Sequence, residues 1–141
     1  MQNQEATSAV TGSKETKMYE SETYYKFNYF AINWVATCGV MNYCHDNKCK
    51  WILDVISSYV LKLSRMRSVD YMLIVEVALD SKRGATFTIS QQPANDEPTV
   101  LIRQTVEFTD LQHGVKFWAI NESADNYDPR SRTVLMLPEE Y

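Results

Sequence analysis

The strongest hydrophobic pattern in the chain is helical and covers residues 48 to 65. Apolar side chains recur there every three or four positions, which predicts an amphipathic helix. The apolar positions are Trp51, Ile52, Val55, Ile56, Tyr59, Val60 and Leu63. A shorter helix is expected at about 37 to 46, because the Thr37 hydroxyl can accept a hydrogen bond from its first turn. Asp46 or Asn47 offers a similar cap for the second helix.

Beyond Asp70 the pattern becomes that of strands. Apolar and polar residues alternate, or apolar residues form short runs, and turn residues separate these segments. The expected strands cover residues 71 to 79, 85 to 91, 99 to 108, 115 to 121 and 133 to 138, and a short extended piece is expected at 32 to 36. Gly84 is expected to supply the positive φ of a tight hairpin turn.

This order of elements predicts an α+β fold. Two N-terminal helices, at about 37 to 46 and 48 to 65, are expected to pack on an antiparallel meander sheet of four to five strands. The length of 141 residues fits one domain. Residues 1 to 17 contain almost nothing apolar, so we expect a flexible tail there and a single domain from 18 to 141.

Charge and apolar run length narrow the class of protein. The net charge of −4 argues against a general nucleic-acid binder, which usually carries a basic excess. No run approaches the roughly 18 consecutive apolar residues of a membrane span, and the polar start does not resemble a secretory signal. We therefore expect a cytoplasmic protein without a membrane partner. No glycine-rich phosphate loop is present, and no cofactor is expected.

All three cysteines and one histidine lie close together in sequence, at Cys38, Cys44, His45 and Cys49. Their number suits zinc, but zinc-binding pairs lie two to four residues apart, whereas Cys38 and Cys44 are six apart. We therefore predict small buried thiols and no metal site. A nucleophilic Cys38 with His45 or His113 as its base remains an alternative, because a helix N-terminus lowers the pKa of a thiol. Whether the four residues meet in space is left open.

A metal-dependent nuclease or hydrolase is a second alternative. Asp70 and Glu76 suggest a pair of Mg²⁺ ligands. The residue two positions after Glu76 is Ala78, where nucleases of the restriction type have a lysine. We assign no catalytic residue.

Cationic and aromatic residues of the later strands and loops form a candidate binding site. Cations can pair with an anionic ligand or partner, and aromatic rings can stack on it. The candidate contact residues are Arg103, Lys116, Trp118, Tyr127 and Arg130, with Arg132 as an alternative to Arg130. A solvated sheet face is the competing interpretation, since long charged side chains commonly cover such a face.

Five short stretches carry a resemblance to a family of small bacterial and phage proteins of unknown function. They read TYYKF, TCGV at 37 to 40, KWILDVISSY at 50 to 59, LIRQTVEFTD at 101 to 110 and VLMLPEEY at 134 to 141. The family usually has Asp at the position of Cys38, which implies that this thiol replaces a first-turn carboxylate. The resemblance also implies architectural roles for Trp51 and Asp54 and for Pro138, Glu139 and Tyr141, with the tryptophan anchoring the core and the C-terminal tail docking back on it.

The resemblance implies a phage or mobile-element accessory protein and brings no activity with it. The leading hypothesis is a non-enzymatic binding protein, acting as a counter-defence factor that inhibits a host immune protein or sequesters a small anionic nucleotide signal. A small metal-dependent nuclease or hydrolase is the alternative. A structural dimerisation module is a further alternative, because exposed strand edges can pair between chains to give a homodimer.

Overall fold

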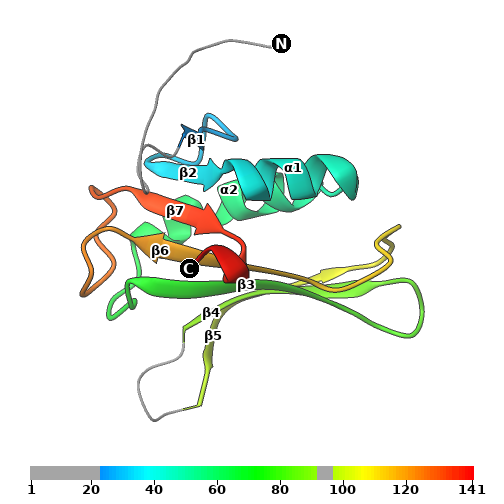
Figure 1. Cartoon of the computed structure of the whole chain (residues 1–141). Coiled ribbons are helices and arrows are strands. Elements are labelled where there is room, and N and C mark those ends of the chain that lie inside the picture. The colour runs from blue at the N-terminus through cyan, green and yellow to red at the C-terminus, as the bar shows by residue number, and fades with distance from the viewer. Residues whose placement is uncertain (1–22, 92–96) are drawn as a thin grey trace.

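In its described residues, the computed structural model of the chain is an α+β fold with two α-helices and one seven-stranded sheet (Figure 1). It describes residues 23 to 91 and 97 to 141, so the predicted tail at 1 to 17 lies outside the described residues. The elements are β1 (Tyr24–Tyr25), β2 (Trp34–Thr37), α1 (Cys38–Asp46), α2 (Trp51–Ser64), β3 (Met72–Leu79), β4 (Ala85–Gln91), β5 (Thr99–Val106), β6 (Val115–Asn121), β7 (Thr133–Met136) and the short 3₁₀ helix η1 (Pro138–Glu140).

Helix α1 begins where its sequence predicts. Thr37 is extended, with φ −69° and ψ 163°, and its Oγ1 accepts a hydrogen bond from Val40 N at 3.1 Å. This bond satisfies one of the backbone donors that a helix leaves free at its N-terminus. Val40 and Cys44 are the buried residues of this helix, so α1 is anchored by one narrow stripe.

The turn between α1 and α2 explains two of the three cysteines. Lys48 has a positive φ of 54°, and Cys49 N donates to Cys44 O at 2.9 Å while Lys48 N donates to His45 O at 3.3 Å. This pair of bonds is a Schellman motif, whose two flanking side chains usually make an apolar contact. Cys44 and Cys49 occupy those flanking positions and are both fully buried. The predicted caps at Asp46 and Asn47 are wrong, because the Schellman turn leads directly into α2 and Lys50 precedes it without a side-chain cap.

Helix α2 faces the sheet with its predicted stripe. Ile52, Ile56 and Leu63 are fully buried. Tyr59 stacks on Phe87 of β4 with ring centroids 6.1 Å apart. Trp51 is only half-buried at the rim, so the large aromatic anchor of the core is Trp34 of β2, which the sequence did not single out. Neither α2 nor the other helices in the described ranges reach the length and apolar character that crossing a membrane requires.

The sheet is larger than predicted and is mixed. Its order is β1-β2-β7-β6-β3-β4-β5, and β2 pairs with β7 in parallel while every other pair is antiparallel. Five of the strands are those expected, and the extended piece at 32 to 36 becomes β2. The prediction of four to five purely antiparallel strands is wrong, because β1 and β2 add to the edge that β7 leaves open.

The sheet is also not a meander. Strands β5 and β6 follow one another in the chain, yet β3 and β4 lie between them in the sheet. The connection from 107 to 114 therefore crosses the ends of β3 and β4 instead of turning tightly. It is held to the β3–β4 turn by Thr109 N, which donates to Arg83 O at 2.8 Å.

The β3–β4 turn corrects a second expectation. Arg83, and not Gly84, has the positive φ, at 67°. Gly84 is needed for space, because a Cβ there would lie 2.9 Å from Val106 O of the neighbouring strand. Asp80 Oδ1 accepts hydrogen bonds from Lys82 N and Gly84 N and so closes the turn.

Replacing Lys48 with glycine should stabilise the protein by about 1 kcal/mol, since a side chain at positive φ costs roughly that much. Lys48→Ala keeps the Cβ and is the matched control, with an expected change below about 0.5 kcal/mol. Urea unfolding measures both values. A glycine variant no more stable than the alanine variant would show that the turn is not strained at Lys48.

Candidate functional site

The helices cover one face of the sheet, and the other face is open. Phe87 and Phe117 point to the helices, where they contact Tyr59 of α2 and Tyr43 of α1. Residues that alternate with them in the strands point the opposite way, because side chains of a strand alternate between its two faces. We call this second surface the open face.

A polar row crosses the open face. Lys116 of β6 lies opposite Glu76 of β3, Glu76 opposite Thr88 of β4, and Thr88 opposite Arg103 of β5. Lys116 and Arg103 are exposed. Because neighbouring strands lie about 4.8 Å apart, the backbone positions of Lys116 and Arg103 are about 14 Å apart across the three strand spacings. The predicted cations therefore share one face and one row but do not converge on one small pocket.

The adjacent row of the open face is apolar. Trp118 of β6 lies between Ile74 of β3 and Met136 of β7, its cross-strand neighbours. All three are half-buried. Tyr141 lies against Trp118 with ring centroids 4.9 Å apart and planes tilted by 49°, and 63% of Tyr141 is exposed. The two rings form an aromatic patch two residues along β6 from Lys116.

The C-terminal segment is fixed in this position by Glu140. Its Oε1 accepts hydrogen bonds from Thr37 Oγ1 at 2.7 Å and from Leu137 N at 2.8 Å. A Cβ on Gly39 would lie 2.5 Å from Glu140 Oε2, so the glycine lets the carboxylate approach the N-terminus of α1. A negative charge is favoured there by the helix dipole. We call these contacts of Glu140 the C-terminal clamp.

The clamp confirms that the tail docks back on the domain, as the resemblance implied. The contacts are made by Glu140 and Tyr141, whereas Glu139 is exposed. The stretches TCGV and LPEEY therefore meet in space. Among the implied architectural residues, Asp54 is also engaged, because its Oδ1 accepts a hydrogen bond from Asn28 Nδ2 at 3.1 Å.

Tyr127 lies away from the open face, on the helix side of the sheet. Its hydroxyl accepts a hydrogen bond from Trp34 Nε1 at 3.0 Å, and burial raises the pKa of this tyrosine. Arg130, in the same connection between β6 and β7, pairs with Asp128 at 3.2 Å and is 90% exposed. The structure thus places Arg103, Lys116 and Trp118 on one face of the sheet and separates Tyr127 and Arg130 from that face.

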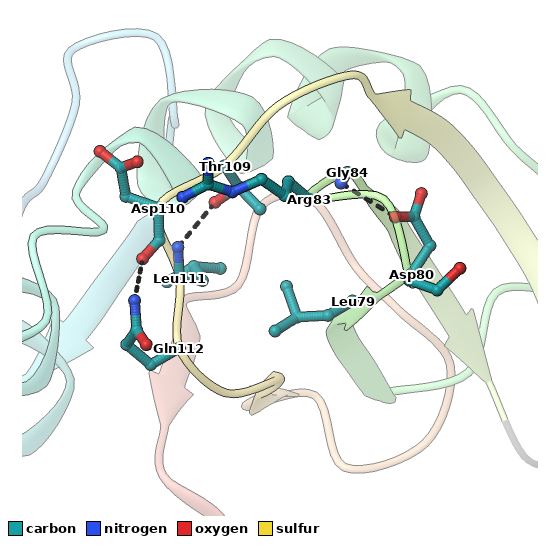
Figure 2. Close-up of a pocket in the computed structure, with 9 residues that line it drawn as sticks. Leu79, Asp80, Arg83, Gly84, Thr109, Asp110, Leu111 and Gln112 are labelled. Atoms are coloured by element: carbon teal, nitrogen blue, oxygen red, sulfur yellow. Dashed lines mark hydrogen bonds between the residues drawn. The ribbon is translucent and has the colours of Figure 1, made fainter.

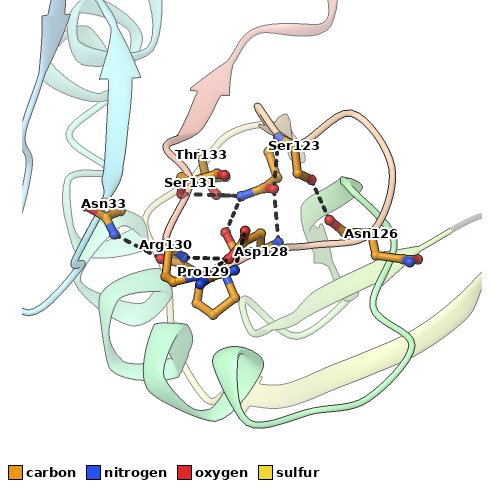
Figure 3. Close-up of polar contacts among 9 residues, drawn as sticks. Asn33, Ser123, Asn126, Asp128, Pro129, Arg130, Ser131 and Thr133 are labelled. Atoms are coloured by element: carbon orange, nitrogen blue, oxygen red, sulfur yellow. Dashed lines mark hydrogen bonds and ion pairs between the residues drawn. The ribbon is translucent and has the colours of Figure 1, made fainter.

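The β6–β7 connection is organised around a buried asparagine (Figure 3). Asn121 Nδ2 donates to Asp128 O and to Thr133 Oγ1, both at 3.0 Å. Its Oδ1 accepts hydrogen bonds from Ser123 N at 3.2 Å and Asp128 N at 3.1 Å. Asn33, which directly precedes β2, joins that strand to the connection by donating from its Nδ2 to Pro129 O at 2.9 Å. This network gives the loop a defined shape without engaging the open face.

The cysteine and histidine cluster is split by the structure. Cys38 is exposed at the first residue of α1, and Asn42 Nδ2 contacts its Sγ at 3.4 Å. The hydrogen bond to Cys49 and then burial raise the pKa of Cys44. His45 lies near the other end of α1, seven residues or about 10 Å along the helix from Cys38. Within residues 23 to 91 and 97 to 141, no three His, Cys, Asp or Glu side chains lie close enough to share a metal ion.

The acidic pair of the nuclease alternative is also separated. Asp70 precedes β3 and accepts a hydrogen bond from Tyr71 N, while Glu76 is in the middle of β3. Six residues of extended chain place them roughly 20 Å apart. They do not face one common metal position.

A polar hollow that the sequence did not reveal lies at the β5–β6 connection (Figure 2). It has a volume of about 270 Å³. It is lined by Leu79, Asp80, Ser81, Arg83, Gly84, Thr109, Asp110, Leu111 and Gln112. Arg83 extends along its rim toward Asp110, with its guanidinium carbon 5.5 Å from the centre of the Phe108 ring. No sequence pattern predicted this hollow, because residues 109 to 114 read as a simple turn.

The fold and its open face define a small α+β protein with an exposed, partly aromatic sheet surface. Residues 13 to 141 match the model of a family of unknown function, DUF6876, and the chain belongs to that family. The match covers all the stretches that carried the resemblance. No curated protein and no solved structure matches the chain.

Asn121→Asp should destabilise the protein by roughly 2 to 4 kcal/mol, because a buried carboxylate cannot donate to Asp128 O or Thr133 Oγ1. Asn126→Asp makes the same charge change on an exposed side chain of the same loop, and we expect less than about 0.5 kcal/mol there. Thermal and urea unfolding distinguish the two variants. Equal losses of stability in the two variants would mean that the added charge, and not the loss of the Asn121 hydrogen bonds, destabilises the protein.

Proposed function

We propose that the protein is a non-enzymatic binding protein whose partner occupies the open face of the sheet. The observation that carries the proposal is the juxtaposition of Lys116, Trp118 and Tyr141 on one exposed surface, with Arg103 in the same polar row. Tryptophan, tyrosine and arginine are the residues that most often dominate protein interfaces. The aromatic patch is the centre of the proposed contact, and the cations form its rim.

The partner class follows from the arrangement of the charges. A small anionic signal is best held by cations that converge on one point. Lys116 and Arg103 are instead spread along a row with Glu76 between them, which suits a broad surface with complementary charges. We therefore favour a protein partner over a nucleotide.

The resemblance to bacterial and phage proteins supports a finer proposal. A small accessory protein of a phage or mobile element that binds a host protein suits a counter-defence role, in which the partner is a host immune protein. Sequestration of a small anionic nucleotide signal is the second candidate, because Trp118 and Lys116 place an aromatic ring and a cation two residues apart on one strand. The two candidates use the same face and differ in the ligand they retain.

Trp118→Ala should abolish capture of the partner from bacterial lysate, because truncating a central tryptophan weakens binding by roughly tenfold to a hundredfold. Lys116→Ala should weaken capture less, as expected of a charge at the rim. Arg130→Ala is the matched control, since Arg130 is exposed and lies outside the open face. Affinity capture followed by mass spectrometry, and titration of the purified partner, give the two readouts.

Three outcomes would decide between the candidates. Loss of a protein partner in Trp118→Ala alone supports the open face and a protein partner. Calorimetry that detects a nucleotide bound through Lys116 assigns the anionic signal instead. Retention of every partner by Trp118→Ala, with loss in Arg130→Ala, would contradict the open face and move the site to the β6–β7 connection.

A further inference from the structure

The sheet has one long free edge, which is β5. The strand is eight residues long and ends the sheet order, and Figure 1 shows no described element beyond it. Its outward backbone N–H and C=O groups therefore have no strand partner within the described part of the chain. Such an edge is a ready template for pairing with another strand. The opposite edge, β1, has only two residues.

Part of this edge is regular. A register shift between Ile89 and Ser90 leaves Leu101 without a cross-strand partner on β4, so β5 is irregular near its start. From Ile102 to Val106 the pairing with β4 is continuous. This regular part is the segment available to a new strand, and Glu107 follows it directly in a bend.

Two exposed opposite charges lie on this segment. Arg103 is in the middle of β5, and Glu107 follows its last residue. Neither charge forms an ion pair with any residue in the ranges that the structure describes. Arg103 and Thr105 belong to the open face of the strand, and Glu107 lies four positions after Arg103, in the bend that follows β5.

This spacing makes the segment complementary to itself. An antiparallel pair of identical strands has a two-fold axis perpendicular to the sheet, so one residue must lie opposite its own copy. Centring the axis on Thr105 places Arg103 opposite the partner subunit's Glu107 and Glu107 opposite the partner subunit's Arg103. Centring it on Arg103 would oppose two like charges, which is destabilising, and centring it on Gln104 would leave both charges unpaired.

We propose that two copies of the chain pair through β5 in antiparallel orientation, with the two-fold axis at Thr105. The two sheets then become one continuous sheet, and both open faces lie on the same side of it. A symmetric pair of this kind is closed, because each copy uses the same edge. Head-to-tail pairing of β5 with β1 would be limited to the two residues of β1. This pairing does not rest on the proposed function and leaves Lys116 and Tyr141 exposed in both copies.

Sedimentation over a range of concentrations tests the pairing. The unaltered chain should form a dimer, and Arg103→Glu or Glu107→Arg should each weaken it by about tenfold or more, because each places like charges opposite one another twice. The double variant Arg103→Glu/Glu107→Arg restores opposite charges in this register and should recover the dimer. A chain that stays monomeric at every concentration, or a double variant no stronger than the single ones, would overturn the proposal. Circular dichroism verifies that each variant is folded.

Cross-linking tests the register itself. In a Cys38→Ser background, Thr105→Cys places two thiols directly opposite across the axis, within reach of a disulfide. Mild oxidation with diamide should give a covalent dimer. Thr86→Cys is the matched control, because Thr86 is the β4 neighbour of Thr105 and lies one strand further from the axis. A dimer in which Thr105→Cys does not cross-link, or cross-links no faster than Thr86→Cys, would overturn the assigned register.

Discussion

The hydrogen bond between the Glu140 carboxylate and the Thr37 hydroxyl joins the last turn of the chain to the start of its first helix. Thr37 simultaneously caps α1, so one threonine side chain serves both contacts. Thr37 also ends β2, the strand that joins the N-terminal part of the fold to the sheet through its parallel pairing with β7. The C-terminal clamp stabilises the junction of β2 with α1, because η1 follows β7 and its Glu140 contacts Thr37 at that junction.

The candidate site depends on the same contact. Tyr141 directly follows Glu140, and its ring lies against Trp118 on the open face. The clamp holds the tail at the N-terminus of α1 while its last ring lies on β6. Gly39 is part of this arrangement, since any side chain there would displace the carboxylate. The helix start and the sheet surface are thus coupled through five C-terminal residues, Leu137 to Tyr141.

Local patterns predicted much of this fold. The stripe of α2, the cap at Thr37 and five strands could be read because periodicity and capping depend on near neighbours in sequence. Side-chain chemistry selected Arg103, Lys116 and Trp118, and the structure places them on one face, although β3 and β4 separate their strands. The parallel pairing of β2 with β7 and the crossing from β5 to β6 were missed, because partners far apart in sequence leave no periodic signal. The Schellman turn was missed because Lys48 replaces the glycine that usually marks it.

Loop residues were the least predictable part of the candidate site. Tyr127 and Arg130 read as ligand contacts because of their side-chain chemistry, but the direction of a loop side chain is set by tertiary contacts. Here the hydrogen bond from Asn121 to Asp128 O fixes the loop. The hydrogen bond from Trp34 to the Tyr127 hydroxyl holds Tyr127 on the helix side of the sheet. The polar hollow at residues 109 to 112 was missed for a related reason, since it exists only where a long crossing connection meets the β3–β4 turn.

The coupling free energy between Thr37 and Glu140 is the most direct measure of the clamp. Unfolding of the unaltered chain, Thr37→Ala, Glu140→Ala and the double variant gives this value from a double-mutant cycle, with Glu139→Ala as the exposed control. We expect a coupling of about 1 kcal/mol or more, as found for side chains that share a hydrogen bond. Additive effects within about 0.3 kcal/mol would contradict the clamp and the placement of Tyr141 that depends on it.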